Sequence, residues 1–261
     1  MSLIQTNGII LRVSNFGEFD RYLTVLTPQL GAIEVLAKRV RRAKGGQARS
    51  TEVFSLCQFI LFQKNDKFKL NQVQLVEGFS GLRTDVVELT CAAHLADIWL
   101  TAVRYEESPQ SLYELAAYTL YALGTSDMNP LAIVRACEVR VLTQAGFGFY
   151  LERCGFCERD VSADPVIDFA LAACQPVCER TSCRRALADL RFRYSKDGAA
   201  IIALDRQTRA AISYFAEAPL PRLYHFKISE RMLTTLADLI PVYLSEHFER
   251  YFHKLDFLNK L

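Results

Sequence analysis

Hydrophobic and polar residues alternate in short runs along the first eighty residues of the chain, which is the pattern of β-strands. Five short strands in about eighty residues match the size of an OB-type barrel. The count alone does not separate an OB-type barrel from an SH3-like barrel. The predicted strands cover residues 8–13, 22–27, 32–37, 53–63 and 68–75.

The spacing of the apolar residues changes after Gly81 to three or four residues, which is the period of an α-helix. The second part of the chain is therefore expected to be mainly helical. Its first three periodic segments cover residues 86–103, 112–122 and 130–146.

Polar capping residues predict where several helices begin. Asn129 stands directly before a proline, an arrangement typical of helix starts, and Asp205 and Ser229 are predicted to cap two further helices. The helix that follows Ser229 is expected to run through Tyr251. Pro241 is expected to kink or break it, because proline lacks the N–H that an inner helical turn needs.

The composition is that of an ordinary globular protein, with 51% hydrophobic and 23% charged residues among 261. No run of eighteen apolar residues is present, which excludes a predicted membrane helix. The N-terminus lacks the charged start and apolar core of a signal peptide. We therefore expect a cytoplasmic protein, and in that reducing environment clustered cysteines favour metal binding over disulfides.

Positive charge is concentrated near the N-terminus, although the net charge of the chain is only +2. Residues 1–80 hold 11 Lys and Arg against 6 Asp and Glu, whereas residues 81–150 hold 4 against 8. A basic segment joined to an acidic one indicates a polyanionic partner for the first.

Five of these positive charges fall within seven residues that follow the third predicted strand. Such a run neutralises phosphates and releases their counterions, which predicts DNA binding. The alternative is a solvated surface loop. The five residues are Lys38, Arg39, Arg41, Arg42 and Lys44.

Aromatic residues interleave with arginines just before this run. Phe16, Phe19 and Tyr22 lie near Arg12 and Arg21, and Arg21 joins the predicted DNA-binding residues. The rings would either stack on bases or belong to the barrel core, and a core position is favoured for Tyr22.

Five of the eight cysteines lie within thirty residues. A Cys-x-x-Cys knuckle, followed about twenty residues later by a second pair, is the spacing of a tetrahedral zinc site. Four cysteine ligands leave no open position, so the predicted zinc is structural. The predicted ligands are Cys154, Cys157, Cys178 and Cys183, with Cys174 as an alternative for the second pair.

The other three cysteines, Cys57, Cys91 and Cys137, lie in apolar runs and are predicted to be buried thiols. No Ser-His-Asp order, phosphate-binding loop or paired-carboxylate pattern is present, and the four histidines do not form a site. The sequence therefore gives no positive indication of an enzyme.

The C-terminal stretch mixes aromatic and basic residues. Arg250, Lys254 and Phe257 are predicted to bind an acidic peptide that ends in a hydrophobic residue. The alternative is a closing helix with a solvated basic edge.

The order of these parts resembles the RecO family of recombination mediators. The resemblance covers essentially the whole chain. It rests on the segments Gly8–Arg12, Gly17–Thr27 and Ala37–Arg42, on Gly31, and on the tail Tyr251–Leu258.

The resemblance implies an α+β protein with two domains. An N-terminal five-stranded OB-type barrel over residues 1–80 would be followed by a mainly helical domain over residues 81–261. A four-cysteine zinc module would be inserted in the second domain at about residues 150–190.

The function that the resemblance implies is a non-enzymatic role in bacterial DNA repair. Members bind single- and double-stranded DNA and anneal complementary strands. With the RecR protein and the C-terminal tail of the single-strand-binding protein SSB, they load the RecA recombinase at gaps. A protein-interaction scaffold with incidental DNA contact is the alternative.

The resemblance also assigns residues. It matches Lys38, Arg39, Arg41 and Arg42 to the basic family segment, and it matches the zinc ligands to Cys154, Cys157 and Cys178. The fourth ligand is expected two residues further on, but here Cys183 follows at a spacing of four, and Cys174 stands where the family usually has glycine. Either the loop is enlarged or Cys174 replaces Cys183.

Overall fold

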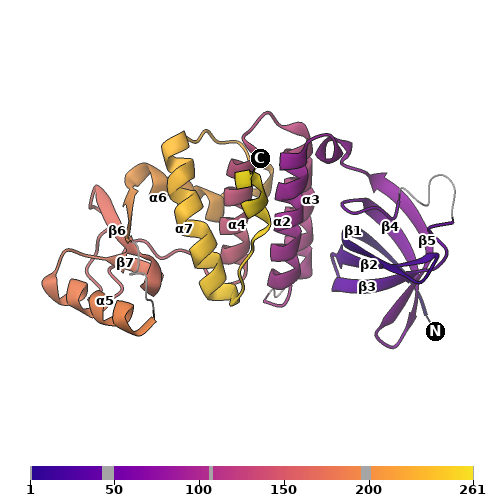
Figure 1. Cartoon of the computed structure of the whole chain (residues 1–261), viewed down its shortest axis with the longest axis horizontal. Coiled ribbons are helices and arrows are strands. Elements are labelled where there is room, and N and C mark those ends of the chain that lie inside the picture. The colour runs from indigo at the N-terminus through magenta and orange to yellow at the C-terminus, as the bar shows by residue number, and fades with distance from the viewer. Residues whose placement is uncertain (1, 43–49, 106–107, 195–200, 261) are drawn as a thin grey trace. The chain divides into compact units, whose positions relative to one another are not determined.

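The computed structural model describes residues 2–42, 50–105, 108–194 and 201–260 (Figure 1). These residues form two compact units, each with its own interior. The first unit comprises residues 1–133 and 253–261, and the second comprises residues 134–252. No helix in the described ranges is long and apolar enough to cross a membrane.

The first unit begins with five strands in a closed barrel of order β1-β2-β3-β5-β4 (Figure 1). The first half of β1 pairs with β4 and its second half with β2, and a short parallel pairing between β3 and β5 closes the barrel. All five predicted strands are present. They are β1 (Ser2–Phe16), β2 (Asp20–Thr27), β3 (Gly31–Ala37), β4 (Leu56–Lys64) and β5 (Lys67–Glu77).

Alternation along the strands places every second side chain inside the barrel. Leu23, Val25 and Phe59 are fully buried there. The core position favoured for Tyr22 is wrong, because the residue next to inward-facing Leu23 must point outward; Tyr22 is half-buried and lines a hollow on the outer face. The predicted burial of the three isolated cysteines is confirmed.

Two helices and two short 3-10 helices complete the first unit. The Asp85 carboxylate caps α2 by accepting the N–H groups of Val87 and Glu88. Gly81 lies against the backbone of Gly124, and a Cβ at residue 81 would lie 2.1 Å from the Gly124 carbonyl oxygen. The elements are η1 (Ser80–Arg83), α2 (Val86–Ala102), α3 (Pro109–Thr125) and η4 (Lys254–Lys260), of which η4 packs on α2.

The second unit combines helices with a three-stranded antiparallel sheet of order β7-β6-β8 that the sequence analysis did not predict. The strands are only three to five residues long, so each gives little periodic signal. Helix α4 (Pro130–Gln144) begins in the first unit and continues in the second. The other elements are β6 (Val166–Ala170), η2 (Leu171–Ala173), β7 (Gln175–Val177), α5 (Thr181–Tyr194), β8 (Ile201–Asp205), α6 (Arg206–Glu217), η3 (Leu220–Arg222) and α7 (Glu230–Phe248).

The three predicted helix caps are confirmed. The side chain of Asn129 accepts the N–H of Leu131 at 2.9 Å, that of Asp205 accepts the N–H of Thr208 at 2.8 Å, and Ser229 caps α7 in the same way. Each cap satisfies an N–H group that has no partner inside its helix.

Helix α7 is shorter than the sequence predicts. It ends at Phe248 rather than Tyr251, because Glu249 takes a left-handed conformation with φ 51° and its N–H returns to the Ser245 carbonyl. Pro241 lies inside the helix without splitting it. The aromatic and basic tail is therefore a separate segment and not the end of a long helix.

Candidate nucleic-acid interface and metal centre

The residues directly after β3 form an ordered turn, which we call the basic turn (residues 38–42). Its backbone is fixed to the β1–β2 turn: the N–H of Arg39 donates to the Asp20 carboxylate at 2.8 Å, and the N–H of Arg41 donates to the Phe19 carbonyl at 3.1 Å. Val40 is buried in the barrel core beneath it. Backbone hydrogen bonds and one apolar anchor thus hold the backbone of the turn in place.

The four cations of the basic turn are exposed at the surface. Among the residues that the structure describes, none of the four is paired with a carboxylate. Unpaired exposed cations keep their positive field available to a polyanion. They are Lys38, Arg39, Arg41 and Arg42, and predicted Lys44 lies outside the described residues.

Two of these arginines also contact the β1–β2 turn. The guanidinium of Arg41 donates to the Glu18 carbonyl at 2.9 Å, and that of Arg42 lies 3.6 Å from the centre of the Phe19 ring. Lys38 has no such contact among the residues that the structure describes. Arg41 and Arg42 therefore have structural contacts, whereas Lys38 has none within the described ranges. Mutating them separately can distinguish an effect on stability from an effect on DNA binding.

Arg21 lies beside the basic turn. It pairs with Ala37, the last residue of β3, across the β2–β3 ladder. Its side chain is half-buried, and its Nε is buried without a hydrogen-bond partner in the described part of the chain. The structure thus brings this predicted DNA-binding residue next to the turn.

The four predicted zinc ligands come together in the second unit. The sulfur atoms of Cys154, Cys157, Cys178 and Cys183 all lie within 4.8 Å of one another. Two of the separations are 3.7 Å, for Cys157 and Cys178, and 3.6 Å, for Cys178 and Cys183. A tetrahedron of sulfurs at the usual Zn–S distance has edges of about 3.8 Å, so the cluster has the size of a thiolate metal site.

The Cys-x-x-Cys knuckle packs against the side chain of Gln175. A Cβ on Gly155 would lie 2.0 Å from the end of that side chain, so a larger residue would displace the flexible Gln175 side chain. The N–H of Cys178 points at the Cys154 sulfur at 3.4 Å, and the N–H of Cys154 is bonded to the Arg159 carbonyl. These contacts hold the first two sulfurs against the second pair.

The thiols of the cluster differ in acidity. Burial alone would raise the pKa of Cys154, but hydrogen bonds to its sulfur, led by the N–H of Cys178, lower that pKa to about 7. Burial raises the pKa of Cys183 to about 12. A divalent cation is what would hold all four sulfurs as thiolates at neutral pH.

Cys174, the alternative ligand, does not join the cluster. It lies after η2 with φ 50°, a left-handed conformation that glycine adopts most easily, and its thiol donates to the Leu171 carbonyl. Burial raises the pKa of this thiol to about 12. The geometry places Cys183, not Cys174, with the other three sulfurs, and this fits an enlarged loop between Cys178 and Cys183.

Comparison with known proteins agrees with both parts of the chain. The family model "Recombination protein O N terminal" matches residues 1–79, and the model "Recombination protein O C terminal" matches residues 83–256. The chain belongs to the RecO family. It is therefore a RecO-family DNA repair and recombination protein.

Several curated RecO relatives are similar over the full chain, and each is called DNA repair protein RecO. The relative from Acetivibrio thermocellus is 28% identical over 261 residues, which cover 100% of this chain and 98% of the relative. The relative from Symbiobacterium thermophilum is 26% identical, also with 100% and 98% coverage. The relative from Thermoanaerobacter sp. is 22% identical, with 100% and 99% coverage.

The three predicted partner-binding residues of this RecO-family chain are divided between the units. Arg250 belongs to the second unit, and its guanidinium lies 5.3 Å from the centre of the Phe252 ring. Lys254 belongs to the first unit and donates to the Ala93 carbonyl at 3.0 Å and to the Asp97 carboxylate at 2.9 Å. Lys254 thus has a structural contact to α2 that the sequence did not reveal.

Phe257 lies in the same C-terminal segment of the first unit and is 47% exposed. It borders a hollow of about 580 Å³ between η4 and α2, together with Leu89, Ala93 and Lys254. Of the three predicted partner-binding residues, Phe257 is the one that offers an open apolar surface.

A second basic cleft, of about 570 Å³, lies between the barrel and α2 within the first unit. Three of its four cations form ion pairs: Arg12 and Lys254 share Asp97, and Arg83 pairs with Glu52. Arg21, the fourth, has no ion pair among the described residues. Arg83 carries no local sequence signal that could have placed it beside β1. Because three of its four cations are held in ion pairs, this cleft is a weaker candidate for DNA than the basic turn.

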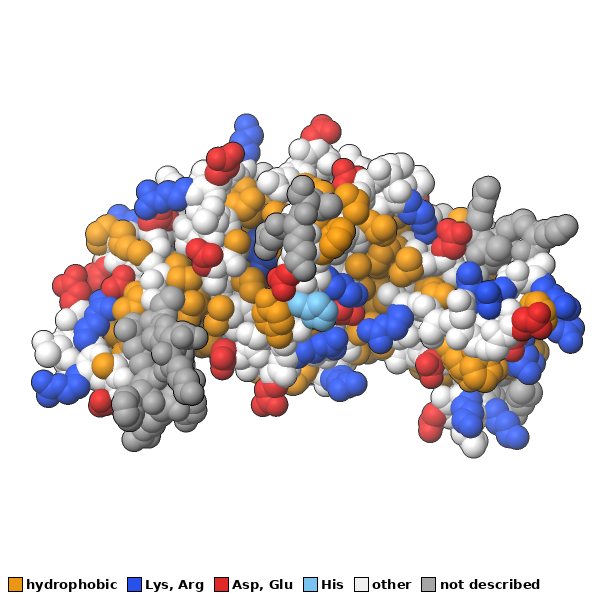
Figure 2. Space-filling view, viewed as in Figure 1, with side chains coloured by type: hydrophobic (Ala, Val, Ile, Leu, Met, Phe, Trp, Pro, Cys, Tyr) orange, Lys and Arg blue, Asp and Glu red, His pale blue; other side chains and the backbone are white. Residues whose placement is uncertain are grey.

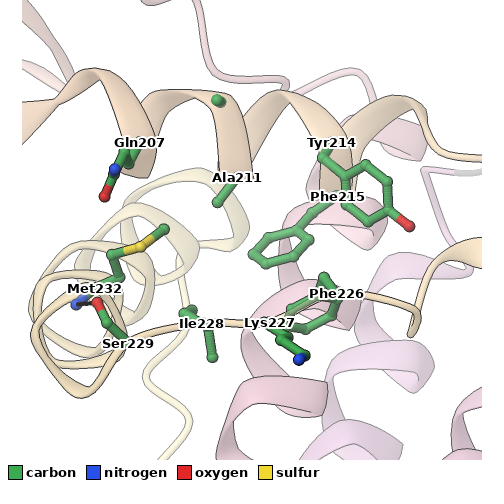
Figure 3. Close-up of a pocket in the computed structure, with 10 residues that line it drawn as sticks. Gln207, Ala211, Tyr214, Phe215, Phe226, Lys227, Ile228, Ser229 and Met232 are labelled. Atoms are coloured by element: carbon green, nitrogen blue, oxygen red, sulfur yellow. Dashed lines mark hydrogen bonds between the residues drawn. The ribbon is translucent and has the colours of Figure 1, made fainter.

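A groove of about 650 Å³ lies between α6 and the segment that leads into α7 (Figure 3). Phe215 from α6 and Phe226 lie against each other at one end of it, with ring centres 4.7 Å apart, and Tyr214 lies beside them (Figure 3). Lys227 stands at its edge. No sequence motif pointed to this groove, because its walls come from two elements separated by a loop.

Proposed function

We propose that the chain is a DNA-binding recombination mediator in bacterial DNA repair. In this role it binds single- and double-stranded DNA, anneals complementary strands, and helps to load RecA onto SSB-coated DNA together with RecR. Membership of the RecO family supports the repair role. The observation that carries the DNA-binding step is the basic turn, whose exposed cations have no carboxylate partner within the described part of the chain.

The proposed mechanism is electrostatic. Cations of the basic turn neutralise phosphates on each strand and reduce the repulsion between two strands, so that their bases can pair. The barrel would act as an OB-type domain over residues 1–80, with the helical domain over residues 81–261. We expect little sequence preference, because contacts to phosphates carry no base information.

The four-cysteine cluster is proposed to hold a structural zinc ion with Cys154, Cys157, Cys178 and Cys183 as ligands. Sulfur separations of 3.6 and 3.7 Å support this assignment. Bound zinc would cross-link a module at about residues 150–190. A set of four thiolates leaves no open coordination position, so the proposal includes no catalytic step.

The proposed protein partners are RecR and the C-terminal tail of SSB, and the proposed location is the cytoplasm at the nucleoid. Exposed Phe257 beside the apolar hollow on α2 supports an SSB-tail contact in the first unit, with Lys254 as a candidate contact to its acidic residues. Arg250, in the second unit, is proposed separately as a partner-binding residue. This surface also motivates the alternative function, a protein-interaction scaffold with little DNA affinity of its own.

Salt-dependent DNA binding tests the proposed function. Fluorescence anisotropy of a labelled single strand and a labelled duplex would be titrated at several salt concentrations. We expect tight binding at low salt that weakens steeply as salt rises. The Lys38→Gln/Arg39→Gln variant should reduce the logarithmic salt slope for the single strand by about 1.4, because two phosphate contacts are lost.

The matched control removes two exposed cations from the second unit, in the Lys227→Gln/Arg231→Gln variant. It has the same change in net charge and should retain the wild-type slope. Equal losses in both variants would show a general charge effect and not a site. Absence of DNA binding by the wild type at low salt would reject the mediator proposal in favour of the scaffold.

A further inference from the structure

A hollow of about 530 Å³ opens on the outer face of the barrel, against β2, β3 and the β4–β5 hairpin. Its floor is one row of residues that are direct neighbours across four strands. Tyr22 pairs with Leu36 across β2 and β3, Leu36 with Lys69 across β3 and β5, and Lys69 with Phe62 across β5 and β4. Direct neighbours in a ladder share a face, so these four side chains form a continuous surface, which we call the outer row.

Three of the four side chains of the outer row, all but Lys69, are aromatic or aliphatic, on a face where polar residues are the rule. The adjacent residues Leu23, Val35 and Leu61 point inward and are fully buried, so the barrel core does not need Tyr22 or Phe62. Both are instead half-buried at the surface. Large apolar side chains that the core does not use indicate a binding surface.

Exposed apolar residues extend the outer row at both ends. Leu3 pairs with Phe62 across β1 and β4 and is 59% exposed. Phe16 is 50% exposed, and its ring meets that of Tyr22 edge to face with centres 5.0 Å apart. The row therefore reaches from the start of β1 to its end, around most of the barrel.

Positive charge borders this apolar surface. The β4–β5 hairpin places exposed Lys64, Lys67 and Lys69 around the hollow, against two carboxylates, Glu34 and Asp66. Within the described ranges, none of the three lysines forms an ion pair. Figure 2 likewise shows Lys and Arg side chains with hydrophobic ones among them on the visible face of the barrel.

Aromatic rings with flanking cations are suited to binding single-stranded DNA. In single-stranded DNA the unpaired bases stack on aromatic side chains while cations follow the phosphates, and in a duplex the base faces are occupied by neighbouring bases. We propose that the outer row takes up unpaired bases and makes the barrel prefer single-stranded over double-stranded DNA. The basic turn then binds the phosphates of both forms. This inference rests on the proposed DNA-binding function.

The test compares two ring-removing variants with two controls. Phe62→Leu and Tyr22→Leu keep an apolar side chain but remove the π-face. Phe62→Tyr keeps the ring, and Ile60→Ala changes an outward-facing residue of β4 away from the hollow. Affinities for single-stranded and double-stranded DNA would be measured by anisotropy, with thermal unfolding to confirm that each variant is folded.

We expect Phe62→Leu to weaken single-strand binding roughly 5- to 150-fold, the range for loss of one stacked base, with duplex affinity unchanged. Tyr22→Leu should act in the same direction, whereas Phe62→Tyr and Ile60→Ala should bind like the wild type. A 2-aminopurine base in the single strand should be quenched by the wild type and much less by Phe62→Leu.

The outcomes separate this inference from the proposed function. Wild-type DNA binding with unchanged single-strand affinity in both Leu variants would overturn the outer row while leaving the basic turn intact. Equal losses for the two DNA forms would also overturn it, because the row would then carry no strand preference. Failure of the wild type to bind either form would overturn the proposed function itself. In that case the row would be a surface for a protein.

Discussion

The basic turn and the cysteine cluster hold their functional atoms in opposite ways. In the basic turn, backbone hydrogen bonds and buried Val40 fix the chain, and the charged residues are exposed at the surface, where two of them also contact the β1–β2 turn. In the cluster, the side chains that would bind metal lie at the centre of the module, and three of the four cysteines are buried. Function and fold can therefore be separated by mutation in the turn but not in the cluster.

The largest expected effect is loss of a cluster ligand. Cys183→Ser replaces a soft thiolate whose sulfur lies 3.6 Å from that of Cys178. We expect zinc affinity to fall more than about 100-fold, because losing a ligand costs more than losing a residue that only hydrogen-bonds a ligand. Hydrogen exchange should then increase across residues 150–190 first, because metal binding energy there is folding energy. Metal analysis and hydrogen exchange check both effects.

Cys174→Ser is the matched control, because its thiol donates to the Leu171 carbonyl and lies outside the cluster. It should retain about one zinc per chain. Retention of zinc by Cys183→Ser together with loss by Cys174→Ser would reverse the ligand assignment. A folded, active wild-type preparation without metal would reject the zinc proposal.

The stability of the barrel should depend on the packing of its core and not on bound metal. Gly8 lies in β1 opposite Cys57, and a Cβ there would lie 2.4 Å from Val25 Cγ1 and 3.2 Å from the Phe59 ring. Gly8→Ala is therefore expected to lower the free energy of unfolding by about 1–3 kcal/mol through overpacking. Urea unfolding of the full chain, followed by a barrel-specific probe such as hydrogen exchange in β1, measures it.

Gly148→Ala provides the control, because a Cβ at residue 148 has nothing within 4 Å. It should leave the stability of the second unit almost unchanged. Destabilisation of both variants by the same amount would show that lost glycine flexibility, and not contact with Val25, sets the effect.

Local patterns in the sequence predicted much of the first unit and the grouping of four cysteines. Alternation and turn residues identified all five strands, and the cysteine spacing identified four thiols that the structure brings together. These features succeed because strand period, helix caps and metal-ligand spacing are encoded by neighbours in the chain. The three-stranded sheet of the second unit was missed, since strands of three to five residues carry almost no period.

Long-range contacts could not be predicted in the same way. The outer row joins Tyr22, Leu36, Phe62 and Lys69 through the closure of the barrel, and no segment of the sequence contains the row. Lys254 reads as a free cation in the sequence, but it is bonded to α2 more than 150 residues earlier in the chain. The strand register and the closure of the barrel place the residues of the outer row together, and the packing of the C-terminal segment on α2 places Lys254. Residue type alone does not reveal either contact.

Asp205 provides a charged side chain whose role is to stabilise the fold, unlike the exposed cations of the basic turn. The Asp205 carboxylate caps α6, and its pKa is lowered, chiefly because it accepts the N–H of Thr208. We expect Asp205→Ala to cost about 1 kcal/mol at neutral pH. Because the folded pKa lies below the unfolded one, this stability is present above the unfolded pKa and is lost as pH falls through the folded pKa.

Urea unfolding of the wild type and of Asp205→Ala at neutral pH and at about pH 2 checks the sign, since the two proteins should converge only in acid. Ser229→Ala removes a cap without a titrating group and should cost about the same at both pH values. A pH-independent difference for Asp205→Ala would show that the carboxylate charge does not contribute.

The smallest expected effect lies inside the basic turn, where fold and function can be separated residue by residue. Arg42→Gln removes a cation that lies 3.6 Å from the Phe19 ring and should cost about 0.5–1 kcal/mol of stability. Lys38→Gln removes an exposed cation without such a contact and should cost nothing measurable. If both cations contact phosphate, each variant should lower the single-strand salt slope by about 0.7. Urea unfolding of the two variants measures their stability, and anisotropy titrations measure the salt slope of their single-strand binding. If Lys38→Gln lowered the stability and left the salt slope unchanged, the turn would be a structural element and not a DNA contact.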